Sequence, residues 1–401
     1  MKTLNETYRL IAKTSAGLEQ VLADEILDLG GEEIELVTRA VAFNGNKALM
    51  YKANYQLRTA LRILVPLTSF KAADESRLYD GIYNIQWHEL LGVHQTFAID
   101  AVVSGGRFTH SQFVAYKAKD AIADQFRNRF GERPSVDTDT PDLRINLHIY
   151  DDQVNVSLDS SGDSLHKRGY RFVVDKAPMN EVLAAGLIRL SGWKGERNFM
   201  DCMCGSATIP IEAAMLAMKI PAGYFRNDYG FMHWNDFDKV LWQQIKEQAD
   251  SEMCDSEIEI IGSDRSAKAI GIAEQNVRFA HLHKDVQLHR LPMDAMNPPV
   301  GGGLMLINPP YGERLEEDDL RALYSNIGDN LKQRFKGWEA WVISSDFQAL
   351  KHIGLKPSKK ITVYNGPLEC RFACFNIFEG RHKDMKKAAG ESSGHSVLSD
   401  N

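Results

Sequence analysis

The spacing of apolar residues divides the chain into a front part with mixed signals and a rear part in which strands and helices alternate. At the front, apolar positions recur alternately at the two-residue spacing of strands and at helical spacing. We expect strand, helix, strand, helix and strand over residues 8–12, 17–29, 34–43, 47–53 and 57–70. This order in so short a space predicts a ferredoxin-like unit over residues 1–70.

A second α+β unit is expected over residues 71–158. It contains a strand at 96–103, an amphipathic helix at 111–129 that carries Lys117, and a hairpin within 143–158. A polar segment at 159–177 then reads as a linker, because its first half is rich in serine and glycine.

The rear part, residues 178–383, repeats short strands and helices. This pattern predicts a parallel sheet with helices on both faces, so the fold class is α/β with a Rossmann-like sheet. The segments 360–364 and 371–378 predict an antiparallel hairpin that closes the sheet. The tail at 384–401 is small, polar and charged, and we expect it to be disordered.

One segment, residues 219–257, interrupts this alternation. It contains aromatic residues that include Tyr224, Phe225, Trp234 and Trp242. Such a composition is too aromatic for a disordered loop, so we expect a packed insertion of unassigned function.

Composition narrows the class of protein. The 401 residues carry a formal net charge of -7, which argues against a nucleic-acid grip spread over the whole surface but not against a local basic face. The cysteine pairs Cys202/Cys204 and Cys370/Cys374 lack the usual zinc spacings, so we expect reduced thiols and no metal. The first residues do not resemble a signal peptide, and no segment has the apolar length of a membrane span, so we expect a cytoplasmic protein.

A first group of candidate site residues lies at a strand-to-helix turn. Small residues there let the backbone approach a ligand closely, although many α/β proteins place glycine at such a turn for packing alone. The candidates are Asp201, Cys204, Gly205, Ser206, Ala207 and Thr208.

Two acidic residues follow at the ends of the next two strands. Asp264, next to Arg265, can accept hydrogen bonds from both ribose hydroxyls, and Asp294, next to Ala295, can accept from an adenine amino group. The alternatives are a helix N-cap for Asp264 and a solvated loop acid for Asp294. Together with the glycine turn they favour an adenosine-containing cofactor, and the chain has no GxxxxGK[ST] phosphate loop.

The most specific motif is Asn308-Pro309-Pro310-Tyr311, directly after an apolar strand at 304–307. The prolines remove two N–H donors, and the Asn308 amide adds an acceptor oxygen, so the cluster suits an amino group. Tyr311 offers a ring for stacking a base. A proline-rich turn would explain the prolines but not their neighbours. Methyl transfer to an amine needs in-line alignment of this kind, after a paired base has been flipped out.

The end of the linker combines positive charge with an aromatic ring. Lys167, Arg168, Tyr170 and Arg171, with Lys117 on the front helix, are candidates for RNA contact. A solvated run of charge is an equally good interpretation of the linker residues.

At these residues the chain resembles the THUMP-containing class I methyltransferases, in particular the bacterial branch of ribosomal-RNA guanine-N2 and N6-adenine methylases. The resemblance covers the linker at 164–171, the loop at Asp201 and the segment 308–315. It implies a THUMP domain that binds RNA, a methyltransferase domain with a terminal antiparallel strand, and S-adenosyl-methionine as cofactor.

The resemblance also assigns roles. Gly205 and its neighbours would line the methionine end of the cofactor, Asp264 the ribose and Asp294 the adenine, while the motif at Asn308 would hold the target amine. The family has proline at the position of Cys202 and glycine at that of Ala207. Alanine is compatible with cofactor binding if the backbone there has negative φ, whereas a positive φ puts this in doubt.

The sequence therefore predicts an RNA methyltransferase that acts on guanine N2 of large-subunit ribosomal RNA, a substrate implied by the resemblance alone. One alternative is methylation of adenine N6 in DNA or RNA. Another is a non-catalytic RNA-binding protein with a vestigial methyltransferase fold. The presence of Asp264, Asp294 and Asn308 counts against the second alternative.

Overall fold

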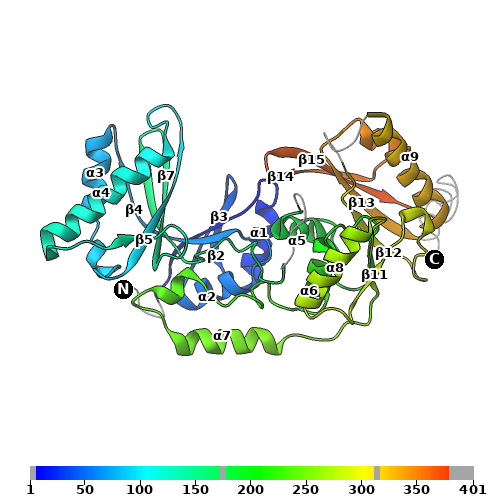
Figure 1. Ribbon diagram of the computed structural model, residues 1–401, viewed down its shortest axis with the longest axis horizontal. Coiled ribbons are helices and arrows are strands. Elements are labelled where there is room, and N and C mark those ends of the chain that lie inside the picture. The colour runs from blue at the N-terminus through cyan, green and yellow to red at the C-terminus, as the bar shows by residue number, and fades with distance from the viewer. Residues whose placement is uncertain (1–5, 172–177, 311–316, 379–401) are drawn as a thin grey trace, which may run out of the picture. The chain divides into compact units, whose positions relative to one another are not determined.

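The computed structural model describes residues 6–171, 178–310 and 317–378 (Figure 1). The predicted tail at 384–401 lies outside these residues. The chain forms two compact units, each with its own sheet. The first comprises residues 1–171, 180–186 and 219–254, and the second comprises residues 172–179, 187–218 and 255–401.

An eight-stranded sheet runs through the first unit in the order β2-β3-β1-β4-β8-β7-β5-β6. Because β4 pairs antiparallel with both β1 and β8, the two predicted front regions share one continuous sheet. The strands are β1 (Tyr8–Lys13), β2 (Glu32–Val37), β3 (Ala40–Gly45), β4 (Arg62–Lys71), β5 (Thr96–Ser104), β6 (Ser135–Val136), β7 (Leu143–Tyr150) and β8 (Gln153–Asp159).

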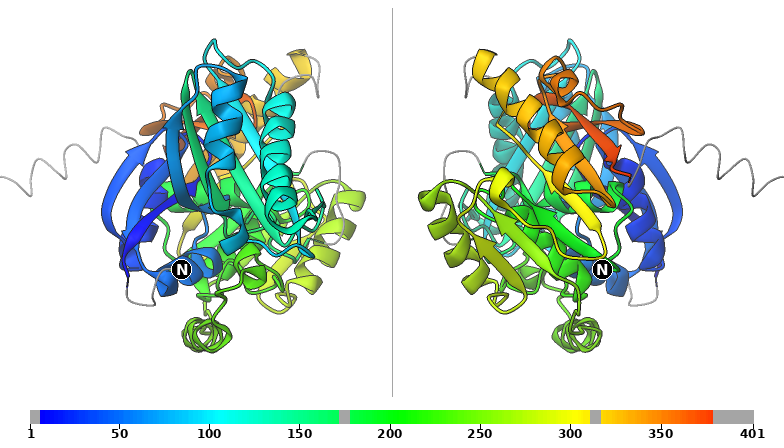
Figure 2. Two further views of the ribbon diagram at one scale, coloured as in Figure 1. Left: turned by 90° about the vertical axis from the view of Figure 1, so that its left-hand side faces the viewer. Right: turned by 90° about the vertical axis from the view of Figure 1, so that its right-hand side faces the viewer.

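The helices of this unit complete a βαββαβ order at the front, which is the ferredoxin-like arrangement. The prediction of one strand over 34–43 is wrong, because β2 and β3 form a hairpin whose turn places Arg39 at φ 57°. The helices are α1 (Glu19–Asp28), α2 (Lys47–Gln56), α3 (Glu75–Tyr83), α4 (Ser111–Phe130) and α7 (Lys239–Ser251). Helices α3 and α4 pack side by side against the sheet (Figure 2).

The second unit contains a seven-stranded sheet in the order β11-β10-β9-β12-β13-β15-β14. The first five strands are parallel, and β15 runs antiparallel to both β13 and β14, which confirms the predicted fold class. The strands are β9 (Asn198–Asp201), β10 (Ile260–Ser263), β11 (Val286–His289), β12 (Gly303–Ile307), β13 (Trp338–Ser344), β14 (Lys359–Asn365) and β15 (Leu368–Asn376).

The strand order reverses between β9 and β12, and open α/β sheets bind ligands outside the carboxyl ends of such strands. Every residue of β12 is buried, as expected for a parallel strand covered on both faces. The accompanying helices are α5 (Glu181–Leu190), α6 (Thr208–Ala217), α8 (Ala267–Phe279) and α9 (Glu317–Arg334), and the first half of α5 belongs to the first unit.

The aromatic insertion belongs to the first unit, although it interrupts the rear part of the sequence. Its Phe231 stacks on Tyr51 of α2 with ring centroids 4.3 Å apart, and Trp242 of α7 meets Tyr55 edge-on at 5.4 Å. These rings lie within the hydrophobic core of the unit. The expected packed insertion therefore completes the core of the front region.

The insertion also holds the segment that follows β8. The two terminal nitrogens of the Arg226 guanidinium donate hydrogen bonds of 2.9–3.3 Å to the carbonyl oxygens of Ser161, Asp163, Ser164, Lys167 and Asp228. Four of these five carbonyls belong to residues 161–167. The side chain thus fixes a stretch of backbone that has no regular secondary structure.

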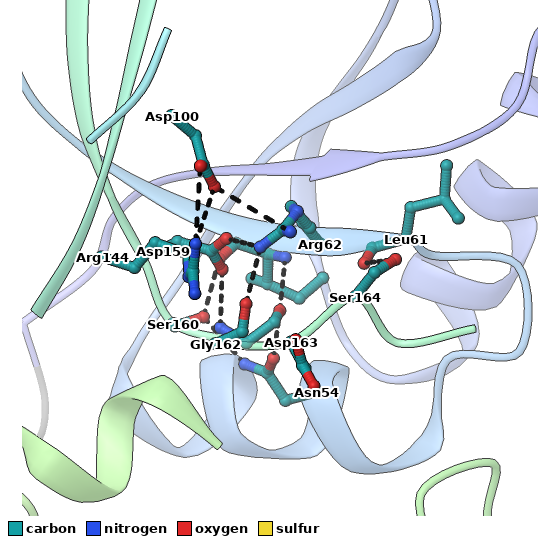
Figure 3. A network of polar contacts seen from close by, with 12 residues as sticks. Asn54, Leu61, Arg62, Asp100, Arg144, Asp159, Ser160, Gly162, Asp163 and Ser164 are labelled. Carbon is teal, nitrogen blue, oxygen red and sulfur yellow. Dashed lines mark hydrogen bonds and ion pairs between the residues drawn. The ribbon is translucent and has the colours of Figure 1, made fainter. Parts of the chain in front are cut away.

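A polar network lies beside this segment, where β4 meets β8 (Figure 3). Arg62 forms an ion pair with the buried Asp159 and donates to the carbonyl of Gly162 at 2.6 Å. Asp100 of β5 accepts from Arg144 of β7 at 3.3 Å. Buried charges are tolerated when such partners surround them, so the network anchors the start of the linker.

Within the described residues, none of the helices has both the length and the apolar character that crossing a lipid bilayer requires.

Candidate active site

The turn after β9 is built around the carboxylate of Asp201. The Met203 N–H donates to Asp201 Oδ1 at 3.0 Å, and the Cys204 N–H donates to the carbonyl of Ser263 on the neighbouring strand at 2.9 Å. The Ala207 N–H then closes the turn on the Cys204 carbonyl at 2.8 Å. These bonds hold the turn against β10 and leave its outer side facing a cavity.

Ala207 adopts the left-handed conformation, with φ 64° and ψ 25°, immediately before α6. This conformation brings Cβ close to the following carbonyl in L-residues and favours glycine. The side chain is fully buried, so the strain cannot be relieved at the surface. Ala207 thus has the positive φ that disfavours alanine, and not the negative φ that would tolerate it. Alanine in place of the family's glycine therefore strains the backbone at this position.

Asp264 connects two backbone segments. Its Oδ2 accepts from the Gly205 N–H at 3.1 Å and its Oδ1 from the Ser266 N–H at 2.8 Å. Ser266, not Asp264, caps α8, because its hydroxyl accepts from the Ala269 N–H. Each carboxylate oxygen has two lone pairs, so Asp264 can still accept one further hydrogen bond at each oxygen.

A cavity of about 810 Å³ lies at the carboxyl ends of β9 to β12, within the second unit. Most of the predicted cofactor residues line it together, whereas Ala207 and Ala295 are not among its lining residues. The predicted residues that do are Asp201, Cys204, Gly205, Ser206, Thr208, Asp264, Arg265, Asp294 and Asn308.

The cavity is acidic. Asp201, Asp264, Asp294 and Asp319 line it, with Arg265 as the basic residue among the lining. Among the described lining residues, four acidic side chains against one guanidinium favour a cationic ligand and disfavour a polyphosphate. S-adenosyl-methionine, which carries a sulfonium and an ammonium against one carboxylate, fits this charge.

Asp201 is the most perturbed of these acids. Burial raises its pKa to about 8, the neighbouring charge of Asp264 acts in the same direction, and the hydrogen bond from Met203 opposes both. A cation brought beside it would favour the ionised form. Asp201 can therefore change its protonation state when a positively charged ligand enters.

The Asn308 motif follows β12 directly. Its amide oxygen Oδ1 is buried and has no hydrogen-bond partner among the described residues. A buried acceptor without a donor is costly and is found where a ligand supplies the donor. Pro310 also lines the cavity, whereas Pro309 is buried beside it. Tyr311, the last residue of the motif, lies outside the described residues.

Sequence reasoning missed one wall of the cavity. Asp319, Ala322, Leu323 and Asn326 of α9 face it, at the i, i+3, i+4 and i+7 positions of one helical stripe. Asp319 and Asn326 are polar residues on a helical face apart from the apolar stripe expected to pack, and their spacing could have marked this side of α9 as facing a ligand. The segment before α5, with Met179, also contributes to the lining.

The structure corrects the interpretation of the linker. Arg168 and Tyr170 are buried inside the first unit, where Arg168 donates to the carbonyls of Leu165 and Arg58. Both the predicted RNA contact and the solvated charge run are therefore wrong for these two side chains. Their hydrogen-bonding and packing requirements are met by the protein itself.

The other two candidate cations of the linker have carboxylate partners. Arg171 pairs with Glu181 at 3.2 Å, and the exposed Lys167 pairs with Asp163 at 3.1 Å. Lys117 on α4 is half-buried, with its Nζ 5.9 Å from the centre of the Tyr79 ring. RNA contact by Lys117, Lys167 and Arg171 stays a prediction.

The cysteines next to the cavity are neutral thiols. Burial raises the pKa of both Cys202 and Cys204 well above the usual value. Across the described ranges 6–171, 178–310 and 317–378, no group of three or more His, Cys, Asp or Glu side chains is arranged to hold a metal ion.

Comparison with known proteins identifies the family. A family described as "RMKL-like, methyltransferase domain" matches residues 168–373, which is just over half of the chain. The chain belongs to the RMKL-like methyltransferase family. A THUMP domain matches residues 72–159 and an RlmL ferredoxin-like domain residues 9–64, so the resemblance inferred from the sequence is confirmed.

Relatives of this RMKL-like chain fall into two lengths. "Ribosomal RNA large subunit methyltransferase K/L" of Syntrophotalea carbinolica is 39% identical over 94% of the chain, which spans 55% of that relative. "Putative RNA methyltransferase slr0064" of Synechocystis sp. is 37% identical, with 93% of the chain and 97% of the relative covered. The chain thus spans about half the length of the K/L relatives and nearly all of the shorter one.

Solved structures resemble the RMKL-like chain along nearly its whole length. The structure described as "SMU.472, a putative methyltransferase complexed with SAH" has a TM-score of 0.84 at 30% identity, covering 94% of this chain and 100% of that one. A possible methylase from Clostridium difficile 630 has a TM-score of 0.85, also at 30% identity and with the same coverage of both chains. The likeness to these two structures therefore extends over the ferredoxin-like, THUMP and methyltransferase domains of the chain.

Proposed function

We propose that the protein is an S-adenosyl-methionine-dependent RNA methyltransferase that methylates the exocyclic N2 amine of guanine in large-subunit ribosomal RNA. The observation that carries this proposal is the buried Asn308 Oδ1, which has no hydrogen-bond partner among the described residues and lies at the wall of an acidic cavity. It provides an acceptor for an amine next to a site suited to a cationic cofactor. Such a substrate implies a cytoplasmic location.

The acidic residues around the cavity would hold the cofactor. Asp264 has an unused acceptor site on each oxygen for the ribose hydroxyls, and the exposed Asp294 can accept from the adenine amino group. Asp201 and the turn at Gly205 would lie at the methionine end. When bound, the cofactor supplies an activated methyl group on a sulfonium.

The Asn308 motif would position the acceptor. The amide oxygen of Asn308 takes a hydrogen bond from the target amine, and the prolines leave their carbonyls available without adding N–H donors. Accepting from the amine directs the nitrogen lone pair and stabilises the charge that develops on nitrogen during transfer. Tyr311 is proposed to stack on the base.

RNA as the substrate class is supported by the THUMP match and by the names of the relatives. The K/L relatives are about twice as long as this chain, so ribosomal RNA is proposed by similarity to the part that they share. Adenine N6 is the second candidate, because an amine-accepting loop suits either base. A Listeria monocytogenes relative of 28% identity is named a predicted N6-adenine-specific DNA methylase.

The test is transfer of labelled methyl from S-adenosyl-methionine to three polymers: ribosomal RNA without its natural modifications, the same RNA carrying them, and duplex DNA. We expect label in the unmodified RNA alone. Label in duplex DNA would move the substrate to the second candidate. Cofactor binding without transfer to any of the three polymers would contradict the proposal.

A further inference from the structure

The hairpin of β14 and β15 and the segment just before it carry an excess of positive charge. Residues 351–371 contain five Lys or Arg residues and one acidic residue, Glu369, in a chain with a net charge of -7. This hairpin forms one edge of the methyltransferase sheet. A basic edge on an acidic protein is the electrostatic signature of a surface that meets a polyanion.

The strand register places several of these residues on one face. Arg371 pairs with Thr362, and Ala373 pairs with Lys360, so Arg371, Thr362 and Lys360 share a face of the hairpin. Tyr364 follows on the same face, whereas Lys359 lies on the opposite one. Lys360 and Thr362 are exposed, and Arg371 and Tyr364 are half-buried.

An exposed aromatic ring adjoins this face. Phe347, in the turn after β13, is 39% exposed, and the Arg371 guanidinium carbon lies 5.0 Å from its ring centre. Phe347, Lys360, Thr362, Tyr364 and Arg371 are called the hairpin patch below. The patch interleaves cations with aromatic rings, the combination on which single-stranded RNA stacks and pairs its phosphates.

The cations of the patch are not neutralised within the described residues. Neither Lys360 nor Arg371 forms an ion pair there, and the buried Nε of Arg371 has no hydrogen-bond partner. The nearest acid in sequence to Phe347, Asp346, is already engaged, because its Oδ1 accepts from the N–H groups of Gln348 and Ala349. Glu369, which pairs with Tyr364 and so shares this face, forms no ion pair with either cation among the described residues, and both cations are therefore available to an external anion.

The position of the patch relates it to the Asn308 motif. Ile307, the last residue of β12, pairs with Val342, which pairs with Ala373, so the motif and Arg371 lie at the same carboxyl edge of the sheet. Two strand spacings separate them, about 10 Å. From Arg371 the hairpin continues beyond the end of β13 to its turn at residues 365–368. It therefore flanks the place where the target amine would enter.

We propose that the hairpin patch is a second RNA-binding surface, which holds the nucleotides next to the target base. Phe347 and Arg371 would stack on an unpaired base, and Lys360 would contact a phosphate. The inference rests on the proposed function and adds a substrate contact within the methyltransferase unit itself. If the patch binds RNA, the methyltransferase unit recognises part of the RNA itself, in addition to the THUMP domain at residues 72–159.

The experiment measures binding of the full chain to a labelled fragment of unmodified ribosomal RNA over a salt series. The double variant Phe347→Ala/Arg371→Gln is expected to bind about tenfold or more weakly, because it removes a stacking platform and a cation. Lys360→Glu is expected to weaken binding several-fold and to lower the salt slope by about one. Lys359→Glu, the adjacent exposed lysine on the opposite face, is the matched control and should bind within about twofold of the parent.

Two readouts separate this proposal from folding defects and from the proposed function. Cofactor affinity should not change in the three variants, because none of the altered residues lines the cofactor cavity. The thermal midpoint of each variant is measured alongside and detects a folding defect. The proposal would be contradicted if Lys359→Glu and Lys360→Glu lost RNA affinity equally, or if the double variant bound RNA as tightly as the parent. Failure of the parent protein to methylate RNA would instead contradict the proposed function, and the binding comparison would remain decisive for the patch.

Discussion

The linker of the first unit and the ligand-facing turns of the second both bury polar groups, but they treat them differently. In the linker, the terminal nitrogens of Arg226 reach five carbonyls, and the buried Asp159 is paired with Arg62. At the cavity, Asn308 Oδ1 has no partner within the part of the chain that the structure describes, and burial raises the pKa of Asp201 to about 8.

The difference separates polar groups that hold the fold from polar groups kept ready for a ligand. A satisfied buried network stabilises a unique conformation, whereas an unsatisfied one is maintained at the expense of stability. Removing a side chain that holds the linker, such as Arg226, should therefore destabilise the protein. Removing one from the cavity should impair function while leaving stability equal or higher.

The largest loss of stability is expected for Arg226→Met. The substitution removes the Arg226 donor from five carbonyls, of which only that of Ser164 keeps another donor among the described residues, the Lys167 N–H. Each buried acceptor left without a donor costs about 1–3 kcal/mol, so we expect a loss of about 3–5 kcal/mol of unfolding free energy. Denaturant unfolding measures it. As a control, Arg127→Met removes an exposed arginine on α4 and should cost less than about 1 kcal/mol. A similar loss of unfolding free energy in both variants would show that the hydrogen bonds of Arg226 do not stabilise the fold more than an exposed arginine does.

Asn308→Ala should show the opposite behaviour. We expect single-turnover methyl transfer to slow by roughly 10²–10³-fold, the effect of losing one preorganised hydrogen-bonding group. No hydrogen bond among the described residues is lost, so the unfolding free energy and cofactor affinity should stay near those of the parent. A stability loss as large as that of Arg226→Met would show that Asn308 serves the fold.

Asp201 predicts a pH dependence. Because the pKa is raised from 3.8 to about 8 in the folded state, folding retains a proton that the unfolded chain releases. This contribution to stability is complete below about pH 4 and is lost as the pH rises towards 8. Asp201→Asn should therefore be more stable than the parent at pH 8, by up to about 5 kcal/mol for a pKa difference of about four units, and no more stable at pH 4.

The same variant should bind S-adenosyl-methionine more weakly at pH 8, because it lacks the carboxylate that the cation would favour. Thermal unfolding and calorimetric titration at the two pH values measure both effects. A stability difference that does not change between pH 4 and pH 8 would contradict the assigned role of Asp201.

The smallest effect concerns Ala207. Replacing it with glycine relieves the left-handed backbone strain and should stabilise the protein by about 0.5–1 kcal/mol without weakening cofactor binding. Ala214→Gly, in the middle of α6, is the matched control and should destabilise by about 1 kcal/mol. The two alanine-to-glycine changes should thus have opposite signs.

The sequence predicted the parts of the molecule in which periodicity and position determine the outcome. The apolar strand predicted at 304–307 and the hairpin predicted at 360–364 and 371–378 correspond to β12 and to β14 and β15. The acidic residues after successive parallel strands converge because those strands end at one edge. The turn at Arg39 was missed because neither glycine nor proline marks it.

The burial of Arg168 and Tyr170 could not be read from a local pattern. It depends on Arg226 and Phe225, which lie more than fifty residues further along the chain. Gly169 shows the same dependence, because its φ is 98° and a Cβ there would lie 2.4 Å from the Phe225 carbonyl oxygen. Long-range packing therefore decided whether this basic, aromatic segment faced RNA or the core.

Nucleoside analysis of RNA methylated by the full chain tests the central claim most directly. Unmodified ribosomal RNA is incubated with labelled S-adenosyl-methionine, digested and separated. We predict a single labelled product, N2-methylguanosine, that forms roughly 10²–10³-fold more slowly when Asn308→Ala replaces the parent. Labelled N6-methyladenosine would keep the amine mechanism and change the base. Label on a ribose or a ring nitrogen, or equal product from Asn308→Ala, would contradict an active site built around the Asn308 amide.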